Sequence, residues 1–251
     1  MAALRVGACQ TMEIFGDFGG VVQRVCDYAA DADAAGVNLM VLPECFLQGY
    51  SLTEEHVRRQ ALAIDSPELN AVLEQLAGVR QTLVLGAIEL AGGRYYNTAL
   101  IILAGRVLGT YRKRFLISGE TMFTPGDAAL VFDCAGVRFG INICSDTRYP
   151  QAAAEAADRG AQVLLVPAQN MMSRDKAVQW QHRHNEIRRQ RVRETGMWLV
   201  SSDVTGERDG THLGLGPTCV MDPTGRIVAE VPVGETGMAV AEIVVPTSRH
   251  I

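Results

Sequence analysis

One cysteine of this chain stands where a side chain can act as a nucleophile. Cys144 follows the apolar run at residues 136–143 and precedes a short polar stretch that ends at Pro150. In an α/β fold, the carboxyl ends of the strands open into the ligand-binding crevice, and backbone N–H groups of the following turn point to the same place. A cysteine of ordinary pKa, about 8.5, is only a few per cent thiolate at neutral pH. Cys144 therefore needs neighbours that activate it as a nucleophile. Without them, it is expected to behave as a small buried apolar residue, as most free cysteines do.

Two other ionisable residues are candidates for those neighbours. Glu44 comes directly after the apolar run at residues 38–43, so its carboxylate stands at the end of a predicted buried strand. Lys113 lies between two arginines, and taken alone this setting favours an exposed surface lysine. Together, a carboxylate, an ammonium group and a thiol form a set that can carry acyl transfer without a histidine.

Other site chemistries have weaker support in the sequence. A hydrolase of the cysteine–histidine type requires a histidine near Cys144, and the sequence does not select one from His56, His182, His184, His212 and His250. His182 and His184 are two residues apart, about 200° around a helix, which is unsuited to joint metal ligation. The six cysteines include no C-x-x-C pair, so neither a zinc site nor a disulfide framework is indicated. We expect no metal, no cofactor and free thiols in a reducing compartment.

The composition is that of a globular protein with a large core. Of 251 residues, 48% are hydrophobic and 20% are charged, and this length suits a single α/β domain spanning residues 1–251. The formal charge of −5 argues against a nucleic-acid or anionic membrane partner. The five arginines at residues 183–193 scatter around a helix, which favours a salt-bridged helix.

Because no apolar run approaches the roughly 18 residues of a membrane span or the length of a signal peptide, we expect a cytoplasmic protein.

Short apolar runs alternate with helical segments along much of the chain. Runs rich in Val, Ile and Leu predict buried strands at residues 4–8, 39–42, 82–88, 99–103, 138–143, 163–166 and 198–201. Helices are predicted at residues 21–35, 67–78, 151–159 and 176–195. Glycine-bearing turns within residues 82–143 indicate an antiparallel or mixed part of a sheet, and the C-terminal part repeats that pattern with strands at 217–221, 226–230 and 238–243. We predict one layered α/β domain with two sheets packed face to face between helices.

The order of the three candidate residues, with the sequence around them, resembles the nitrilase, or carbon-nitrogen hydrolase, superfamily. The likeness is carried by Leu-Pro-Glu44, by Tyr-Arg-Lys113 followed by Phe-Leu, and by Gly-Ile-Asn-Ile-Cys144-Ser-Asp-Thr-Arg-Tyr-Pro. Further similarities occur in the same order along almost the whole chain: Gln10, Asn97-Thr-Ala, Thr124-Pro-Gly-Asp127, Val166-Pro-Ala, Arg191 with Glu194, and Asp222-Pro-Thr-Gly225.

This resemblance implies a fold and a mechanism. The fold is a four-layer α-β-β-α sandwich in which Glu44, Lys113 and Cys144 meet. In this family the carboxylate acts as general base, the thiolate attacks a carbonyl or nitrile carbon to form a thioester, and the lysine stabilises the tetrahedral intermediate. The backbone N–H of Ser145 is the natural second donor to the oxyanion. Glu120 stands where many members place a second glutamate that helps to position lysine and substrate.

The residue after the nucleophile departs from the family pattern. That position is usually aromatic, whereas this chain has Ser145, and Cys-Ser-Asp favours an amidase over the Cys-Trp-Glu of true nitrilases. Arg148 either binds a substrate carboxylate as a bidentate fork, or pairs with Asp146 or another local acid and braces the turn. Asn170 follows the next strand, so we expect it to line the pocket.

The expected function is hydrolysis of a small linear amide to a carboxylic acid and ammonia or an amine. An N-carbamoyl compound and a nitrile are alternative substrates for the same chemistry, and a non-catalytic interaction module is the alternative from another functional class. The resemblance also implies a homodimer or a larger homo-oligomer.

Overall fold

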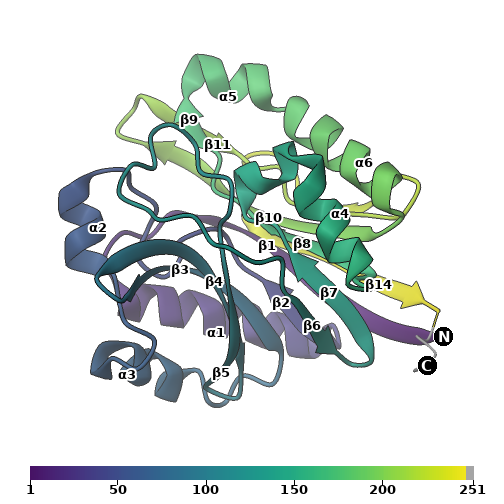
Figure 1. Cartoon of the computed structure of the whole chain (residues 1–251), viewed down its shortest axis with the longest axis horizontal. Coiled ribbons are helices and arrows are strands. Elements are labelled where there is room, and N and C mark those ends of the chain that lie inside the picture. The colour runs from purple at the N-terminus through teal and green to yellow at the C-terminus, as the bar shows by residue number, and fades with distance from the viewer. Residues whose placement is uncertain (247–251) are drawn as a thin grey trace.

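The computed structural model describes residues 1–246 and places two β-sheets between two layers of helices (Figure 1). The first sheet has the order β5-β4-β3-β2-β1, with β14 antiparallel to most of β1. Its strands are β1 (Ala2–Met12), β2 (Leu39–Val41), β3 (Thr82–Ala91), β4 (Arg94–Leu103), β5 (Arg106–Arg112) and β14 (Gly237–Val245). β1, β2 and β3 run parallel, and β3, β4 and β5 form an antiparallel meander, as the glycine-bearing turns predicted.

The second sheet has the order β6-β7-β8-β10 and continues through β12 to β13. Its strands are β6 (Val131–Cys134), β7 (Val137–Ile141), β8 (Val163–Pro167), β10 (Trp198–Arg208), β12 (Cys219–Met221) and β13 (Ile227–Glu230). β10 belongs to both sheets, because its first half pairs with β8 and β12 and its second half pairs in parallel with the end of β1. A small extension, β11 (His212–Leu215) with β9 (Met171–Ser173), continues from the second half of β10.

The alternation of side chains along the strands explains the layers. In β2, Leu39 and Val41 face the core between the sheets, whereas Met40 faces the helices α1 (Phe18–Ala34) and α3 (Pro67–Gln75). In β8, Val163 and Leu165 face the same central core. Leu164 faces the opposite helical layer, which contains α4 (Pro150–Asp158) and α6 (Arg183–Thr195). Strands buried on both faces account for the continuous apolar runs in the sequence.

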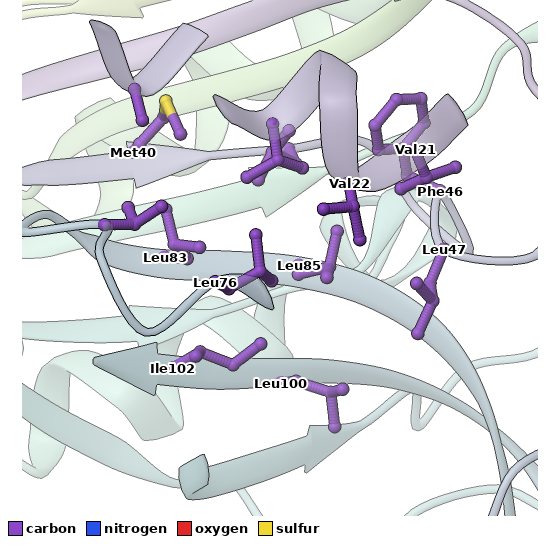
Figure 2. Packing of buried hydrophobic residues seen from close by; sticks show 14 of the residues in the cluster. Val21, Val22, Met40, Phe46, Leu47, Leu76, Leu83, Leu85, Leu100 and Ile102 are labelled. Atoms are coloured by element: carbon purple, nitrogen blue, oxygen red, sulfur yellow. The ribbon is translucent and has the colours of Figure 1, made fainter. Parts of the chain in front are cut away.

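The outer core beneath α1 and α3 is shown in Figure 2. Val21 and Val22 from α1 and Leu76 just after α3 pack with Leu83, Leu85, Leu100 and Ile102 from the first sheet. Each fully buried side chain of this size contributes about 1.5–3 kcal/mol by leaving water, so this layer stabilises the packing of α1 and α3 on the first sheet.

The structure departs from the sequence predictions in its helices. The segment predicted as one helix at residues 176–195 is two helices, α5 (Arg174–Trp180) and α6, separated by a turn at Gln181 and His182. The additional helix α2 (Glu54–Gln60) is capped by the Thr53 hydroxyl, and a short 3-10 helix, η1 (Cys144–Arg148), follows β7. Within residues 1–246, no helix is both long and apolar enough to cross a membrane.

Candidate active site

The predicted residues Glu44, Lys113 and Cys144 reach a single pocket of about 230 Å³. Glu44 comes after β2, Lys113 directly after β5 and Cys144 after β7, so each stands at the carboxyl end of a strand or just beyond it. The same pocket is lined by three other predicted site residues, Ser145, Arg148 and Asn170. Glu120 does not line the pocket and contacts Lys113 instead.

Close backbone packing places Glu44 over the first sheet. A Cβ atom at Gly86 of β3 would collide with the backbone of Pro43 and Cys45, the residues on either side of Glu44. Only glycine therefore allows the chain after β2 to cross β3 at this distance. The backbone N–H of Leu47 donates to the carbonyl of Gly86 at 2.9 Å, which holds the crossing in place.

Lys113 is an ammonium group buried between two carboxylates. Its Nζ lies 2.7 Å from Oε1 of Glu44 and 2.8 Å from Oε1 of Glu120, and all three side chains are at most 1% exposed. The side-chain Nδ2 of Asn97 donates to the same two oxygens, at 2.7 Å and 3.1 Å. The prediction from local sequence that Lys113 is a surface lysine is wrong. The lysine lies inside because buried charges of the opposite sign compensate its loss of hydration.

The two glutamates differ in how their oxygens are used. Glu120 accepts through both oxygens: Lys113, Asn97 and the Tyr50 hydroxyl donate to Oε1, and the backbone N–H of Ile117 donates to Oε2 at 2.8 Å. Glu44 accepts only through Oε1, and within residues 1–246 no hydrogen bond reaches its Oε2. Glu120 is therefore equipped to hold the lysine, whereas Glu44 keeps one oxygen available for a proton.

The electrostatics of the cluster favour a charged lysine and a neutral thiol. Burial raises the pKa of the Cys144 thiol and the Glu44 charge raises it further, while Lys113 opposes both. Burial also raises the pKa of Glu44 against the opposing effect of Lys113. For Lys113, burial lowers the pKa, but Glu44, Cys144 and Glu120 together raise it above its usual range. The resting thiol consequently needs a base to become a nucleophile.

Cys144 is the first residue of η1, three residues after the end of β7, and its backbone is strained. Its φ of +45° is in the left-handed region, which is unusual for a residue with a Cβ and is stabilised only by its surroundings. The Ser145 hydroxyl donates to the carbonyl of Phe115 at 2.6 Å, and the Thr147 hydroxyl donates to the carbonyl of Cys144 at 2.7 Å. The thiol itself lies 3.8 Å from Oδ1 of Asn170.

Asp146 connects η1, which begins at Cys144, to the segment that follows Lys113. This buried carboxylate accepts from the backbone N–H groups of Arg114 and Phe115, at 3.1 Å and 2.7 Å, and from the Tyr111 hydroxyl at 2.8 Å. The alternative in which Arg148 pairs with Asp146 is wrong, because local N–H and O–H donors already satisfy the carboxylate. Arg148 instead places its guanidinium over the ring of Trp180, 5.5 Å from the centroid, on the pocket wall.

No histidine of residues 1–246 is hydrogen-bonded to Cys144. His184 lines the pocket, but burial, with Arg188 and Arg148, lowers its pKa to about 3, so the ring is neutral and a poor base. His250 lies outside the described residues. Among the residues described, no group of three or more His, Cys, Asp or Glu is arranged to hold a metal ion.

Sequence reasoning missed several residues of this site. Tyr50 carries no local signal, because Glu120, to which its hydroxyl donates, is 70 residues away along the chain. His184 was one of five histidines among which the sequence could not choose. Asn97 is one of the family landmarks in the sequence, but its bridge between Glu44 and Glu120 depends on strand β4 lying beside β3. The sequence around Asp203 does not indicate that Asp203 contacts Asn170. This contact joins β10 to the loop after β8.

Comparisons with known proteins identify the family and agree with the fold. The family model for carbon-nitrogen hydrolases matches residues 5–251. A nitrilase of Pyrococcus abyssi is 32% identical over 219 residues, which cover 85% of this chain and 79% of the relative. An omega-amidase of Xenopus laevis is 26% identical over 234 residues, 88% of this chain and 82% of the relative. The crystal structure of Saccharomyces cerevisiae Nit3, a nitrilase-superfamily member, superimposes with a TM-score of 0.83 at 25% identity, covering 96% of this chain and 90% of that one. The predicted sandwich fold is confirmed by this likeness.

Proposed function

The chain belongs to the carbon-nitrogen hydrolase family, and we propose that it is a cysteine-dependent amidase that hydrolyses a small linear amide to a carboxylic acid and ammonia or an amine. One observation carries the proposal. Lys113 and Asn97 hold one oxygen of the Glu44 carboxylate and leave the other without a hydrogen bond in a pocket that also contains Cys144. A carboxylate, a cation and a thiol line one pocket, which supports roles for them as base, oxyanion donor and nucleophile.

The first half of the reaction forms a thioester. Glu44 takes the proton of the Cys144 thiol, and the sulfur attacks the amide carbon. The resulting oxyanion is stabilised by the Lys113 ammonium and the backbone N–H of Ser145. Glu44 then returns its proton to the nitrogen of the leaving group, the C–N bond breaks, and ammonia or an amine departs.

The second half releases the acid. Water enters the vacated space, Glu44 takes a proton from it, and the hydroxide adds to the thioester carbon. Lys113 and the Ser145 N–H again stabilise the oxyanion, the C–S bond breaks, and the sulfur regains its proton from Glu44. A single oxyanion donor of this kind contributes roughly 3 kcal/mol, about a hundredfold in rate.

The pocket favours a small acyl group. Its volume of about 230 Å³ is lined by apolar side chains such as Leu52, Ile117 and Met171, and one wall carries Arg148. No acidic side chain within residues 1–246 forms an ion pair with Arg148. We therefore propose that this guanidinium binds a carboxylate at the far end of the acyl chain, while Asn170 contacts the reacting end beside the thiol.

Relatives of this chain support amide chemistry without fixing the substrate. A nitrilase and an omega-amidase are both among them, and Ser145 beside the nucleophile favours the amidase side. Ammonia release should be measured over monoamides of dicarboxylic acids, aliphatic amides, N-carbamoyl amino acids and nitriles. We expect the highest kcat/KM for a linear amide. Turnover of nitriles or carbamoyl compounds alone contradicts the amidase assignment, and no turnover of any compound favours an interaction module.

We also propose that the protein works as a homo-oligomer in the cytoplasm. The support is the family resemblance and the expectation of free thiols. Analytical ultracentrifugation of the purified full chain should give a mass of at least two protomers of 27.1 kDa, and a purely monomeric species at micromolar concentration contradicts the proposal.

A further inference from the structure

Asp203 is a buried carboxylate that the reaction described above does not use. The residue lies in β10 and is fully buried. Its Oδ1 accepts from the backbone N–H groups of Asn170 and Val204, both at 2.9 Å. Its Oδ2 accepts from the side-chain Nδ2 of Asn170 and lies 3.5 Å from an Arg188 guanidinium nitrogen. Burying a carboxylate costs free energy because the charge loses its hydration. A function of Asp203 would therefore explain its place in the interior.

Asp203 fixes the direction of the Asn170 amide. A side-chain amide has a donor end and an acceptor end, and its hydrogen-bond partners decide which end points where. Because Nδ2 of Asn170 donates to Asp203, the Oδ1 of Asn170 is turned to the opposite side. There it lies 3.8 Å from Sγ of Cys144, within the range of a hydrogen bond from a thiol.

An oxygen in this position has opposite effects on the two forms of the sulfur. It accepts a hydrogen bond from the neutral S–H group, and it repels the negative charge of a thiolate. We propose that Asp203 is a positioning residue for Cys144, which it keeps protonated and oriented in the resting enzyme by holding the Asn170 amide with its oxygen toward the thiol. The proposal rests on the proposed role of Cys144 as nucleophile.

Such an arrangement suits a cysteine that is deprotonated only during reaction. A resting thiolate is exposed to alkylation and oxidation, whereas a thiol is less reactive. Holding the S–H group until Glu44 accepts its proton confines the reactive form to the step that needs it. Arg188 completes the arrangement from α6, because its other hydrogen bonds, to the carbonyl of Pro217 at 2.7 Å and to Asn185 at 3.3 Å, keep it beside Asp203.

Several charged groups act on the Cys144 thiol. After burial, Glu44 and Asp203 raise its pKa, and Lys113 and the backbone N–H of Gln169 lower it. The other ionisable groups on the pocket walls are Tyr50, Arg148 in η1, and His184 and Arg188 in α6. Burial raises the pKa of Asp203 itself to about 7. Since the thiol titrates above its usual value, Asp203 is ionised throughout the range in which Cys144 loses its proton.

The test is the pH dependence of Cys144 alkylation in an Asp203→Asn variant. The new side chain keeps an oxygen for the N–H groups of Asn170 and Val204, and it places an NH₂ group against the NH₂ of Asn170. The Asn170 amide must then turn and present its own NH₂ to the sulfur. We expect the midpoint of iodoacetamide labelling to fall by about one pH unit or more, which makes labelling at pH 8 about tenfold faster.

Site-resolved mass spectrometry should follow the peptide that contains Cys144, because the chain has five other cysteines. Ser202→Ala is the matched control, since Ser202 is the buried neighbour in β10 and its hydroxyl has no hydrogen-bond partner among residues 1–246. The midpoint in this control should stay at the wild-type value. Asp203→Ser retains one acceptor and removes the partner of the Asn170 NH₂, so it serves as the second variant if Asp203→Asn fails to fold.

A double variant separates positioning from a direct effect of charge. In an Asn170→Ala background, Asp203→Asn should shift the midpoint by less than half as much as in the wild type. An unchanged or raised midpoint in Asp203→Asn overturns the proposal, and so does a shift that survives in full without Asn170. Either result leaves the amidase proposal intact as long as Cys144→Ala abolishes turnover. Full turnover in Cys144→Ala contradicts the amidase proposal directly.

Discussion

Two adjacent residues, Arg112 at the end of β5 and Lys113 directly after it, enter two different ion clusters, each built on buried carboxylates. Arg112 donates from Nε to Oε2 of Glu89 at 2.9 Å and from a second nitrogen to Oε1, and the Thr98 hydroxyl also donates to Oε2 at 2.7 Å. The Arg112 guanidinium stacks over the Tyr96 ring, 3.8 Å from its centroid. Both carboxylate oxygens of Glu89 are occupied, so this cluster is closed.

Lys113 faces the opposite side of the sheet and enters a cluster that is open at one oxygen. Glu44 and Glu120 share its ammonium group, but within residues 1–246 Oε2 of Glu44 has no hydrogen-bond partner. The comparison teaches that a buried ion pair does not by itself mark a catalytic site. The distinguishing feature is a carboxylate oxygen without a hydrogen bond in a pocket that also contains a thiol, because the proposed general base needs such an atom to accept a proton.

The largest expected effect is a difference in kcat between variants of Glu44 and Glu89, the carboxylates that pair with Lys113 and Arg112. Glu44→Gln removes the proposed base while keeping the shape of the side chain, and kcat should fall by about 10³-fold. Glu89→Gln alters the closed cluster and should leave kcat within about twofold of the wild type, since general-base catalysis is untouched. Steady-state ammonia release measures both variants. Equal losses in the two would remove the distinction between the clusters.

The cations themselves provide the next test. Lys113→Met removes a donor to the oxyanion, and kcat should fall by about a hundredfold. Arg112→Met should keep its activity and lose about 2 kcal/mol of the free energy of unfolding, a moderate cost because the Arg112 side chain is 34% exposed. Urea denaturation and turnover assays, run on the same preparations, check the pair. An inactive but fully stable Arg112→Met would show that the closed cluster also serves catalysis.

A smaller effect is expected in the pH profile. Glu44 must be ionised to act as a base, and burial raises its pKa, so kcat/KM should fall as the pH drops through a value above the usual range for glutamate. Glu120→Gln removes a neighbouring charge that also raises this pKa, and the acidic limb should therefore move to lower pH. Glu89→Gln should leave the limb in place. An acidic limb that does not move in Glu120→Gln argues against Glu44 as the group that titrates.

The smallest effect concerns substrate recognition. Arg148→Met should raise KM for an amide that bears a distal carboxylate by about tenfold, because a charge-assisted hydrogen bond is lost. For an uncharged aliphatic amide of the same length, KM should change little. A matched pair of substrates measures the difference, and equal KM changes for both would place Arg148 in a purely structural role.

The sequence predicted which side chains meet at the pocket better than it predicted their environments. Glu44 and Cys144 follow continuous apolar runs, and such runs mark strands whose ends meet at one edge of the sandwich. Lys113 was predicted at the site only in combination with Glu44 and Cys144, because its neighbours alone favour an exposed lysine. Its burial depends on Glu44 and Glu120, which are 69 and 7 residues away along the chain. Asp146 likewise could not be read from local sequence, since its donors come from the segment after β5.

The division of the predicted helix at residues 176–195 has a similar cause. Helical periodicity continues through Gln181 and His182, but α5 packs on β11 and α6 packs on α4, and one straight helix cannot do both. Tertiary packing thus overrides the local preference. The salt-bridged helix predicted from the arginines is found in part: Arg188 and Arg191 form ion pairs with Asp203 and Glu194. Arg189 and Arg193 instead donate to backbone carbonyls near Gly225.

The central claim is that the pocket works through Cys144 as a nucleophile. Its most direct test is the rate of ammonia release by Cys144→Ala on the best substrate of the wild type, with circular dichroism and thermal unfolding as checks on folding. The account predicts a folded protein whose rate falls to the background of the assay. A folded Cys144→Ala variant that keeps a substantial part of the wild-type rate would contradict it.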